Sequence, residues 1–285
     1  MSKKKRFLKI AAFVAAMALI VGVIVFANAL IGNPVSKHLA KSAAEEYLVE
    51  NFPDGDYIIA RTSYSWKTGG GYYINLVSPS SIDSSFEIYT DMAGNIVYDT
   101  YESNVLQHGN TVSRLEKEYR ELCDSVLNSP LFPYRSDIAY GTLEYTFGDL
   151  AGYPGAPDYY IVREELELDK IYDIRELGAQ AGMITLYVQD EDVSFEHAAE
   201  ILLDLKELMD GSGVPFKTVF FTLQYPPSTD GVPRPDGRVN FSNFAYEEIY
   251  EEGLTERVKA AHEALEAYYA EQDALRAEFF SYLEE

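Results

Sequence analysis

The feature that most constrains this chain is an almost unbroken apolar run over residues 7–31, which follows a basic tip at residues 1–6. No charged residue lies between Ile10 and Ile31. An apolar helix of about 20 residues spans a hydrocarbon core of about 30 Å, and a helix satisfies its own backbone polar groups there. The run therefore predicts a single transmembrane anchor, with residues 7–31 in contact with a lipid bilayer.

The distribution of basic residues predicts the orientation of this anchor. Five bases precede Ile10, whereas only Lys37 and Lys41 closely follow the run. The positive-inside rule places residues 1–6 in the cytoplasm and the bulk of the chain outside the cell membrane. Residues 27–29 also satisfy the small-x-small rule for signal-peptide cleavage, and cleavage after Ala29 would release a secreted protein. The run exceeds the roughly 7–15 apolar residues of a signal core, which favours an uncleaved anchor.

The part of the chain beyond the anchor is strongly acidic. It holds all 46 acidic residues and 18 of the 23 basic ones, because the other five bases precede Ile10, so its formal charge is −28. Binding to a nucleic-acid backbone needs the opposite charge, and we therefore expect no nucleic-acid partner. Cys123 is the only cysteine, which excludes an intramolecular disulfide. Its place on the apolar side of a predicted helix indicates a buried structural thiol rather than a reactive one.

Residues 32–104 are expected to form a membrane-proximal α+β domain. Asn33 is a typical N-cap and Pro34 a typical first helical residue, so a helix is predicted to run to Asn51. Its expected apolar face comprises Val35, Leu39, Ala43, Tyr47 and Leu48. Strand-like runs then predict an antiparallel meander packed on the helix, with strands at residues 57–66, 72–77, 85–90 and 96–101.

Residues 105–285 are expected to form a distal α+β domain. A helix over residues 110–127 is predicted to begin at a cap formed by Asn110 or Thr111, and a helix after Asp173 to end at Gly178. A helix capped by Ser194 lies between two strand patterns, so part of the sheet is expected to be parallel. The predicted strands of this domain lie at residues 141–147, 159–168, 183–189, 216–225 and, as an edge strand, 238–241.

The final helix, over residues 255–283, carries the strongest periodic pattern after the anchor. Its apolar positions alternate steps of three and four for four heptads: Val258, Ala261, Leu265, Tyr268, Gln272, Leu275, Phe279 and Tyr282. The helix over residues 110–127 has the same spacing, so we expect these two helices to pack together. The alternative is that the final helix forms a coiled coil with a partner, and the pattern leaves the oligomeric state open.

Several short segments together resemble a known family. They are Asn33-Pro34, Glu45-Glu46-Tyr47-Leu48, Phe52-Pro53, Asp91 to Asn95, Asn110-Thr111-Val112 and Tyr172 to Gly178. The chain resembles the YfjL-like family, which comprises uncharacterised membrane-anchored proteins of Gram-positive bacteria. Its first domain is more distantly similar to PepSY-type modules, which occur outside membranes and are often linked to peptidase regulation. The resemblance implies placement and fold and supplies no catalytic residues.

Titratable residues show no recognisable catalytic or metal-binding spacing. The four histidines, His38, His108, His197 and His262, lie far apart, and each is expected on a helix surface or near a helix start. In so acidic a chain, Glu164-Glu165 and Glu247-Glu248 are typical of solvated faces. The sequence therefore predicts no catalytic, cofactor-binding or metal-binding residue.

Five short motifs suggest chemistry by their residue types alone. Gly69-Gly70-Gly71 is not followed by the Lys-Ser/Thr and helix of a phosphate loop, and Gly211-Ser212-Gly213 lacks the strand that precedes a nucleophile elbow. Asp190-Glu191-Asp192 and Asp230 to Gly237 could hold calcium outside a cell, but neither matches the calcium-loop pattern, which favours turn chemistry. Asn240-Phe241-Ser242 is a glycosylation sequon only in a eukaryotic secretory pathway.

These observations favour a membrane-anchored extracytoplasmic protein that works by binding rather than catalysis, with a membrane or cell-wall protein as its partner. One alternative is a hydrolytic enzyme whose site is assembled from residues dispersed in the sequence. Another is a cation-binding or ligand-binding wall protein, which the formal charge of −28 would suit.

Overall fold

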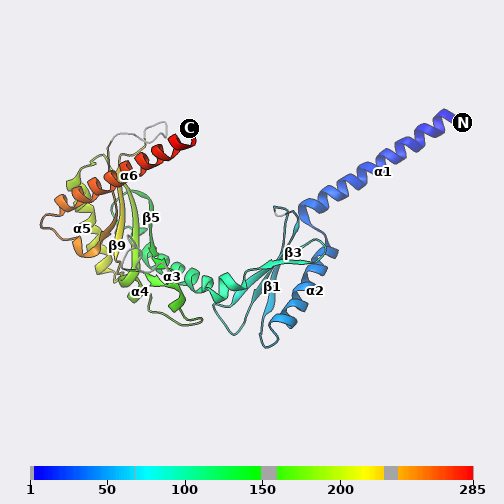
Figure 1. The fold of residues 1–285 in the computed structure, drawn as a ribbon, viewed down its shortest axis with the longest axis horizontal. Helices are drawn as coiled ribbons and strands as arrows, with labels where there is room; N and C mark the ends of the chain where they lie inside the picture. The colour runs from blue at the N-terminus through cyan, green and yellow to red at the C-terminus, as the bar shows by residue number, and fades with distance from the viewer. Residues whose placement is uncertain (1–2, 68, 149–158, 228–236, 285) are drawn as a thin grey trace. The chain divides into compact units, whose positions relative to one another are not determined.

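The computed structural model describes residues 3–67, 69–148, 159–227 and 237–284 (Figure 1). It is an α+β protein with an N-terminal apolar helix, two sheet-containing parts and a long C-terminal helix. The chain divides into two compact units. Unit 1 comprises Met1–Thr111 with Glu167–Asp169, and unit 2 comprises Val112–Leu166 with Lys170–Glu285.

The N-terminal helix α1 spans Lys3–Ile31. Its segment Lys9–Ala27 has a mean hydropathy of 2.9 with none of its residues buried, so α1 is long and apolar enough to cross a bilayer. Gly32 follows with a φ of +70°, and a Cβ there would lie 2.5 Å from the hydroxyl oxygen of Tyr72. That hydroxyl donates to the Asn33 carbonyl at 2.8 Å, which fixes the start of the next helix on the sheet of unit 1.

Unit 1 consists of one helix packed on an antiparallel meander, as the sequence predicts. Helix α2 spans Pro34–Asn51 and is capped by Asn33, whose side chain accepts from the Ser36 amide. The sheet has the order β1-β2-β3-β4, with strands Ile58–Ser65, Gly71–Val77, Ser85–Asp91 and Ile96–Asp99. A π-helical turn, Glu102–Leu106, follows β4. Figure 1 shows α2 alongside this sheet.

The predicted apolar face of α2 is partly wrong. Val35 is 69% exposed and Leu39 is 43% exposed, whereas the buried residues are Ser36, Ala40 and Ala44. Small side chains let the helix approach the sheet closely, and the strands supply the bulk of this core. Tyr47 and Leu48 do pack against that core, as expected, together with the strand residues Tyr72, Ile74, Leu76, Phe86 and Ile88.

Reciprocal hydrogen bonds between Asp83 and Asp169 hold the β2–β3 loop of unit 1. The carboxylate of Asp83 is fully buried and accepts from the Thr111 hydroxyl and the Asp169 amide, each at 3.0 Å. The carboxylate of Asp169 in turn accepts from the Asp83 amide at 3.1 Å. The Asn110 amide donates to the Asp83 carbonyl at 2.7 Å, so Asn110 and Thr111 bind this loop and are not the expected helix caps. Helix α3 instead begins at Gly109 and runs to Leu127.

Unit 2 contains a mixed four-stranded sheet in the order β10-β9-β8-β5. Its strands are β5 Ser136–Leu143, β8 Gly182–Gln189, β9 Thr218–Gln224 and β10 Arg238–Ala245. The helices are α4 Ile174–Ala181, α5 Phe195–Gly211 and α6 Leu254–Glu284, with 3-10 turns at Arg163–Glu165 and Tyr246–Glu248. Strands β8 and β9 are parallel and joined through α5, which confirms the predicted crossover.

Three predicted boundaries in unit 2 are wrong. The pattern at residues 141–147 belongs to β5, which begins five residues earlier, and to the short strand β6, Tyr145–Thr146. The expected strand at 159–168 is reduced to β7, Ile161–Val162, which pairs in parallel with β6. Helix α4 continues past Gly178 to Ala181, so this glycine does not end the helix. A Cβ at Gly178 would lie 2.5 Å from the ring of Tyr119, so the glycine permits close packing instead.

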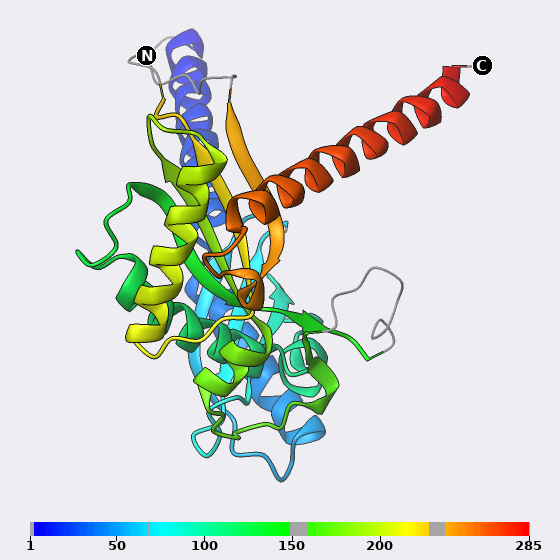
Figure 2. The same cartoon turned by 90° about the vertical axis from the view of Figure 1, so that its left-hand side faces the viewer.

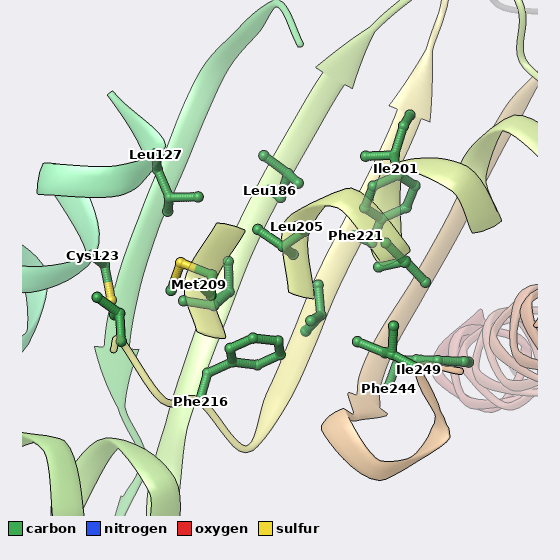
Figure 3. Close-up of a cluster of buried hydrophobic side chains, with 14 of the residues drawn as sticks. Cys123, Leu127, Leu186, Ile201, Leu205, Met209, Phe216, Phe221, Phe244 and Ile249 are labelled. Atoms are coloured by element: carbon green, nitrogen blue, oxygen red, sulfur yellow. The ribbon is translucent and has the colours of Figure 1, made fainter. Parts of the chain in front are cut away.

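Helices α3 and α5 enclose the core of unit 2 against the sheet, as Figure 3 shows for Cys123, Leu205 and Phe221. Cys123 is fully buried beside Gly141, and burial raises the pKa of its thiol to about 12, which confirms a structural cysteine. Helix α6 packs against α5 and β10, so the expected pairing of α3 with α6 is wrong. Helix α3 packs beside Gly141 of β5, at the opposite edge of the sheet from β10, against which the first part of α6 packs.

Candidate binding surface

The C-terminal helix α6 is buried at its start and exposed further along. Val258 is fully buried, and Ala261 and Leu265 are partly buried. The next apolar positions of the same heptad pattern lie in solvent: Tyr268 is 54% exposed, Leu275 53% and Phe279 61%. Figure 2 shows this part of α6 extending away from α5 and the sheet of unit 2. We call Tyr268, Gln272, Leu275 and Phe279 the α6 stripe.

A hollow lies at the root of the α6 stripe. The pairing of β10 with β9 shifts register between Phe241 and Phe244, and Asn243 in this bulge has a φ of +54°. The bulge carries Ser242 and Asn243 toward α6, where small alanines leave room. The cavity has a volume of about 550 Å³ and is also lined by Ala261, Ala264, Leu265, Tyr268 and Tyr269. A bulky side chain of another helix would fit such a hollow as a knob fits a hole.

Aromatic pairs widen the exposed surface of α6. Tyr268 and Tyr269 lie with their ring centroids 5.8 Å apart, and Phe279 and Phe280 lie 6.0 Å apart. Large exposed aromatics that repeat along one helix are typical of surfaces that another molecule covers. The charged residues Asp273 and Arg276 pair with each other at 3.5 Å on the same turns.

The four histidines lie on different segments: His38 on α2, His108 just before α3, His197 on α5 and His262 on α6. His197 lies near the start of α5, where its amide donates to the Ser194 hydroxyl at 3.2 Å. Its Nε2 atom lies 3.4 Å from the Asp190 carboxylate and its Nδ1 atom 3.3 Å from the Glu200 carboxylate. These two contacts hold the loop between β8 and α5. Within the described residues, no group of three His, Cys, Asp or Glu side chains is arranged to hold a metal ion.

The acidic motifs form turns and ion pairs. The Asp192 amide donates to the Asp190 carboxylate at 3.0 Å and lowers the pKa of that carboxyl, which is the predicted turn chemistry. Glu247 pairs with Lys217 at 2.8 Å. Glu164 and Glu165 are exposed on a 3-10 turn, as expected of solvated residues. Asp230 and Asp236 lie outside the described residues.

One histidine has a role that the sequence did not indicate. His262 on α6 lies beside the edge strand β10, where its Nδ1 atom is 3.3 Å from the backbone amide nitrogen of Asn240 and 3.1 Å from the Asn240 carbonyl oxygen. This contact covers an edge polar group that would otherwise be open to another strand. It also brings Asn240, which the sequence marks only as a sequon, next to α6. The contact between His262 and Asn240 could not be predicted, because the sequence does not specify how their two elements pack.

Unit 1 offers a contrasting surface on the face of its sheet opposite α2. Tyr73, Tyr89 and Tyr98 lie across three neighbouring strands, with ring centroids 4.8 and 5.3 Å apart. The Tyr98 hydroxyl donates to the Tyr73 hydroxyl at 3.1 Å, and this bond raises the pKa of Tyr98 to about 12. Tyr89 also covers Gly71, where a Cβ would lie 2.6 Å from its hydroxyl. These tyrosines therefore supply one another's ring contacts, and Tyr73 and Tyr98 share a hydrogen bond.

Two family profiles match the chain. Residues 7–100 match the YfjL-like, N-terminal domain, and residues 118–259 match the YfjL-like C-terminal domain. The chain belongs to the YfjL-like family. A crystal structure of a DUF5037 family protein from Ruminococcus gnavus is similar at 14% identity and a TM-score of 0.25, over 78% of this chain and 98% of that chain. No curated protein matches the chain. The α6 stripe lies beyond the residues that the C-terminal family profile matches.

Proposed function

We propose that this YfjL-like protein is a membrane-anchored extracytoplasmic protein that binds another membrane or cell-wall protein through the α6 stripe. One observation carries the proposal: a single heptad pattern is buried or partly buried up to Leu265, whereas its large apolar members Tyr268, Leu275 and Phe279 are exposed. A continuous pattern of this kind is expected to be covered along its whole length when the protein works. The uncovered half therefore marks the contact.

The energetics of the α6 stripe support a binding role. Burying one large apolar side chain contributes about 1.5–3 kcal/mol, so covering Tyr268, Leu275 and Phe279 would offset much of the cost of association. Their spacing follows the pattern of a helix laid in an apolar groove or against a second helix. The hollow at Ser242 and Asn243 adds a place for one anchoring side chain.

The proposed location rests on α1 and on charge. Helix α1 is long and apolar enough to span a bilayer, and five bases cluster in its first seven residues. The positive-inside rule then supports a cytoplasmic tip at residues 1–6 and a partner on the outer side of the membrane. The acidic composition of the remaining chain supports a protein surface rather than an anionic lipid surface as the partner.

The test compares two substitutions on opposite sides of α6 in the full-length protein in its native membrane. Leu275→Glu places a charge in the α6 stripe, and Ala277→Glu places the same charge on an exposed position outside it. Proteins that co-purify with each variant are quantified by mass spectrometry. We expect one membrane or wall protein that is retained by Ala277→Glu and lost with Leu275→Glu. Equal retention by both variants would contradict the proposal.

A further inference from the structure

A cleft of about 590 Å³ lies beside α6, on a side that does not carry the residues of the α6 stripe, and Tyr269 lines both this cleft and the hollow at the root of the stripe. Its floor is the face of the unit 2 sheet that carries Tyr187 of β8, Phe220 of β9 and Asn240 of β10. Its wall is α6, which contributes Glu266 and Tyr269. The neighbouring strand residues Leu186 and Phe221 are buried in the core, so the alternation of the strands directs the cleft residues to the opposite face.

The floor of the cleft carries an aromatic platform. The rings of Tyr187 and Phe220 are half-buried, with centroids 5.9 Å apart and planes inclined by only 25°. These two stacked rings give the floor of the cleft an apolar aromatic surface. A ligand with a flat apolar face can lie on it, whereas a ligand charged on every side would lose hydration there.

Polar groups with both hydrogen-bonding roles surround the platform. Asn240 is only 7% exposed, and its Oδ1 atom has no hydrogen-bond partner among the described residues. A buried acceptor without a partner is costly, which points to a donor from a ligand. Gln224 adds an amide, and Arg238 pairs with Glu266 at 3.7 Å across the cleft. The cleft therefore presents amide, guanidinium and carboxylate groups within one small volume.

We propose that this cleft binds one or two rings of a neutral saccharide. A pyranose ring has an apolar C–H face that can lie on Tyr187 and Phe220, and its hydroxyls donate and accept at once. Such hydroxyls match the mixed lining, in which Asn240 Oδ1 needs a donor and Arg238 needs acceptors. An ammonium ligand offers donors alone, and a phosphate meets the carboxylates of Glu266 and Asp273. The volume lies within the range of about 300–1,000 Å³ usual for small-ligand sites.

The test titrates full-length protein in lipid nanodiscs with cellobiose and with N,N′-diacetylchitobiose, and separately with choline chloride and inorganic phosphate, by calorimetry. We expect saturable binding of at least one disaccharide, weakened about tenfold or more by Tyr187→Leu or Phe220→Leu. Tyr140→Leu is the matched control, because Tyr140 lies on β5 of the same sheet but outside the cleft. Its titration should equal that of the unchanged protein.

Several results would overturn the proposal. They are no saturable binding of either disaccharide, binding of choline or phosphate in their place, and equal affinities for Tyr187→Leu and Tyr140→Leu. Thermal unfolding of each variant verifies its fold, and Gln224→Leu replaces any platform variant that fails to fold, since Gln224 is only partly buried. Leu275→Glu should bind the disaccharide unchanged, so failure of the partner proposal and failure of this one give different results.

Discussion

Helices α3 and α6 carry the same heptad spacing, yet their heptad positions differ in burial. In α3, the positions Leu115, Tyr119 and Val126 are all buried in the core of unit 2. In α6, the large apolar positions beyond Leu265, which are Tyr268, Leu275 and Phe279, lie exposed to solvent. Apolar periodicity therefore identifies the side of a helix that will be covered, but it does not identify the molecule that covers it. Substitutions in the two helices distinguish the part that the protein itself covers from the part left for a partner.

The largest effect is expected at Tyr119 of α3. Tyr119→Ala removes a fully buried ring and its hydrogen bond to the Pro215 carbonyl at 2.9 Å. We expect a loss of about 3–5 kcal/mol in the free energy of unfolding, because the ring fills space beside Gly178 and Gly182. Chemical denaturation followed by near-UV circular dichroism measures this loss. A loss below about 1 kcal/mol would show that the α3 positions do not hold the core.

A smaller loss is expected at the start of α6. Val258 is fully buried against unit 2, so Val258→Ala should lower the free energy of unfolding by about 2 kcal/mol. Ala260→Gly, at an exposed position of the helix, serves as the control in the same denaturation experiment. It should cost about 1 kcal/mol through the lower helix propensity of glycine alone. If Val258→Ala were neutral, the division of α6 into a packed half and an exposed half would be wrong.

Acidity provides a further way to examine α3. Burial raises the pKa of Glu116, whose carboxylate accepts from the Leu143 amide at 3.1 Å. A carboxyl with a raised pKa favours the folded state when protonated, so its stabilising effect is present below the unfolded pKa of about 4.3 and is lost as pH rises through the folded value. Glu116→Gln keeps the acceptor and should raise the melting temperature at pH 7 but not at pH 4.

The control for this pH dependence is Glu121→Gln on the same helix. Glu121 is exposed and pairs with Lys117 at 3.7 Å, so its replacement should leave the melting temperature nearly unchanged at pH 7. An equal gain from both substitutions would indicate relief of the general negative charge rather than burial of Glu116.

The smallest effect on stability is expected within the α6 stripe. Leu275→Glu should change the free energy of unfolding by less than about 0.5 kcal/mol, because Leu275 is 53% exposed. Denaturation of the full-length protein in nanodiscs measures the change. A loss of about 2 kcal/mol or more would mean that the protein itself covers the α6 stripe, which would remove the reason for a partner.

Local sequence signals specified most helices and strands. The Asn33-Pro34 cap, the Asp173 cap and the Ser194 cap all begin helices, and the alternating runs of unit 1 all form strands. These signals are encoded within a few residues, so they are readable without tertiary information. Predictions that depended on a neighbouring element were less successful. Gly178 does not end α4, and its missing side chain instead leaves room for the ring of Tyr119 from α3.

The candidate sites were less readable than the fold. The heptad pattern predicted the side of α6 on which the α6 stripe lies, but not that burial would stop after Leu265. The cleft was not predicted at all, because Tyr187, Phe220 and Asn240 meet only through the strand order β10-β9-β8. Strand order is set by long-range packing, and no short segment of this sequence encodes it.

Site-specific photocrosslinking in living cells tests most directly whether the α6 stripe binds a partner protein. A photoreactive phenylalanine analogue is placed at Leu275, in the α6 stripe, or at Ala277, outside it, in the full-length protein. We expect a discrete adduct with one membrane or wall protein from position 275 and none from position 277. Identical adducts from both positions, or adducts from position 275 with lipid or with copies of the same chain alone, would contradict the proposal that the α6 stripe binds a partner protein.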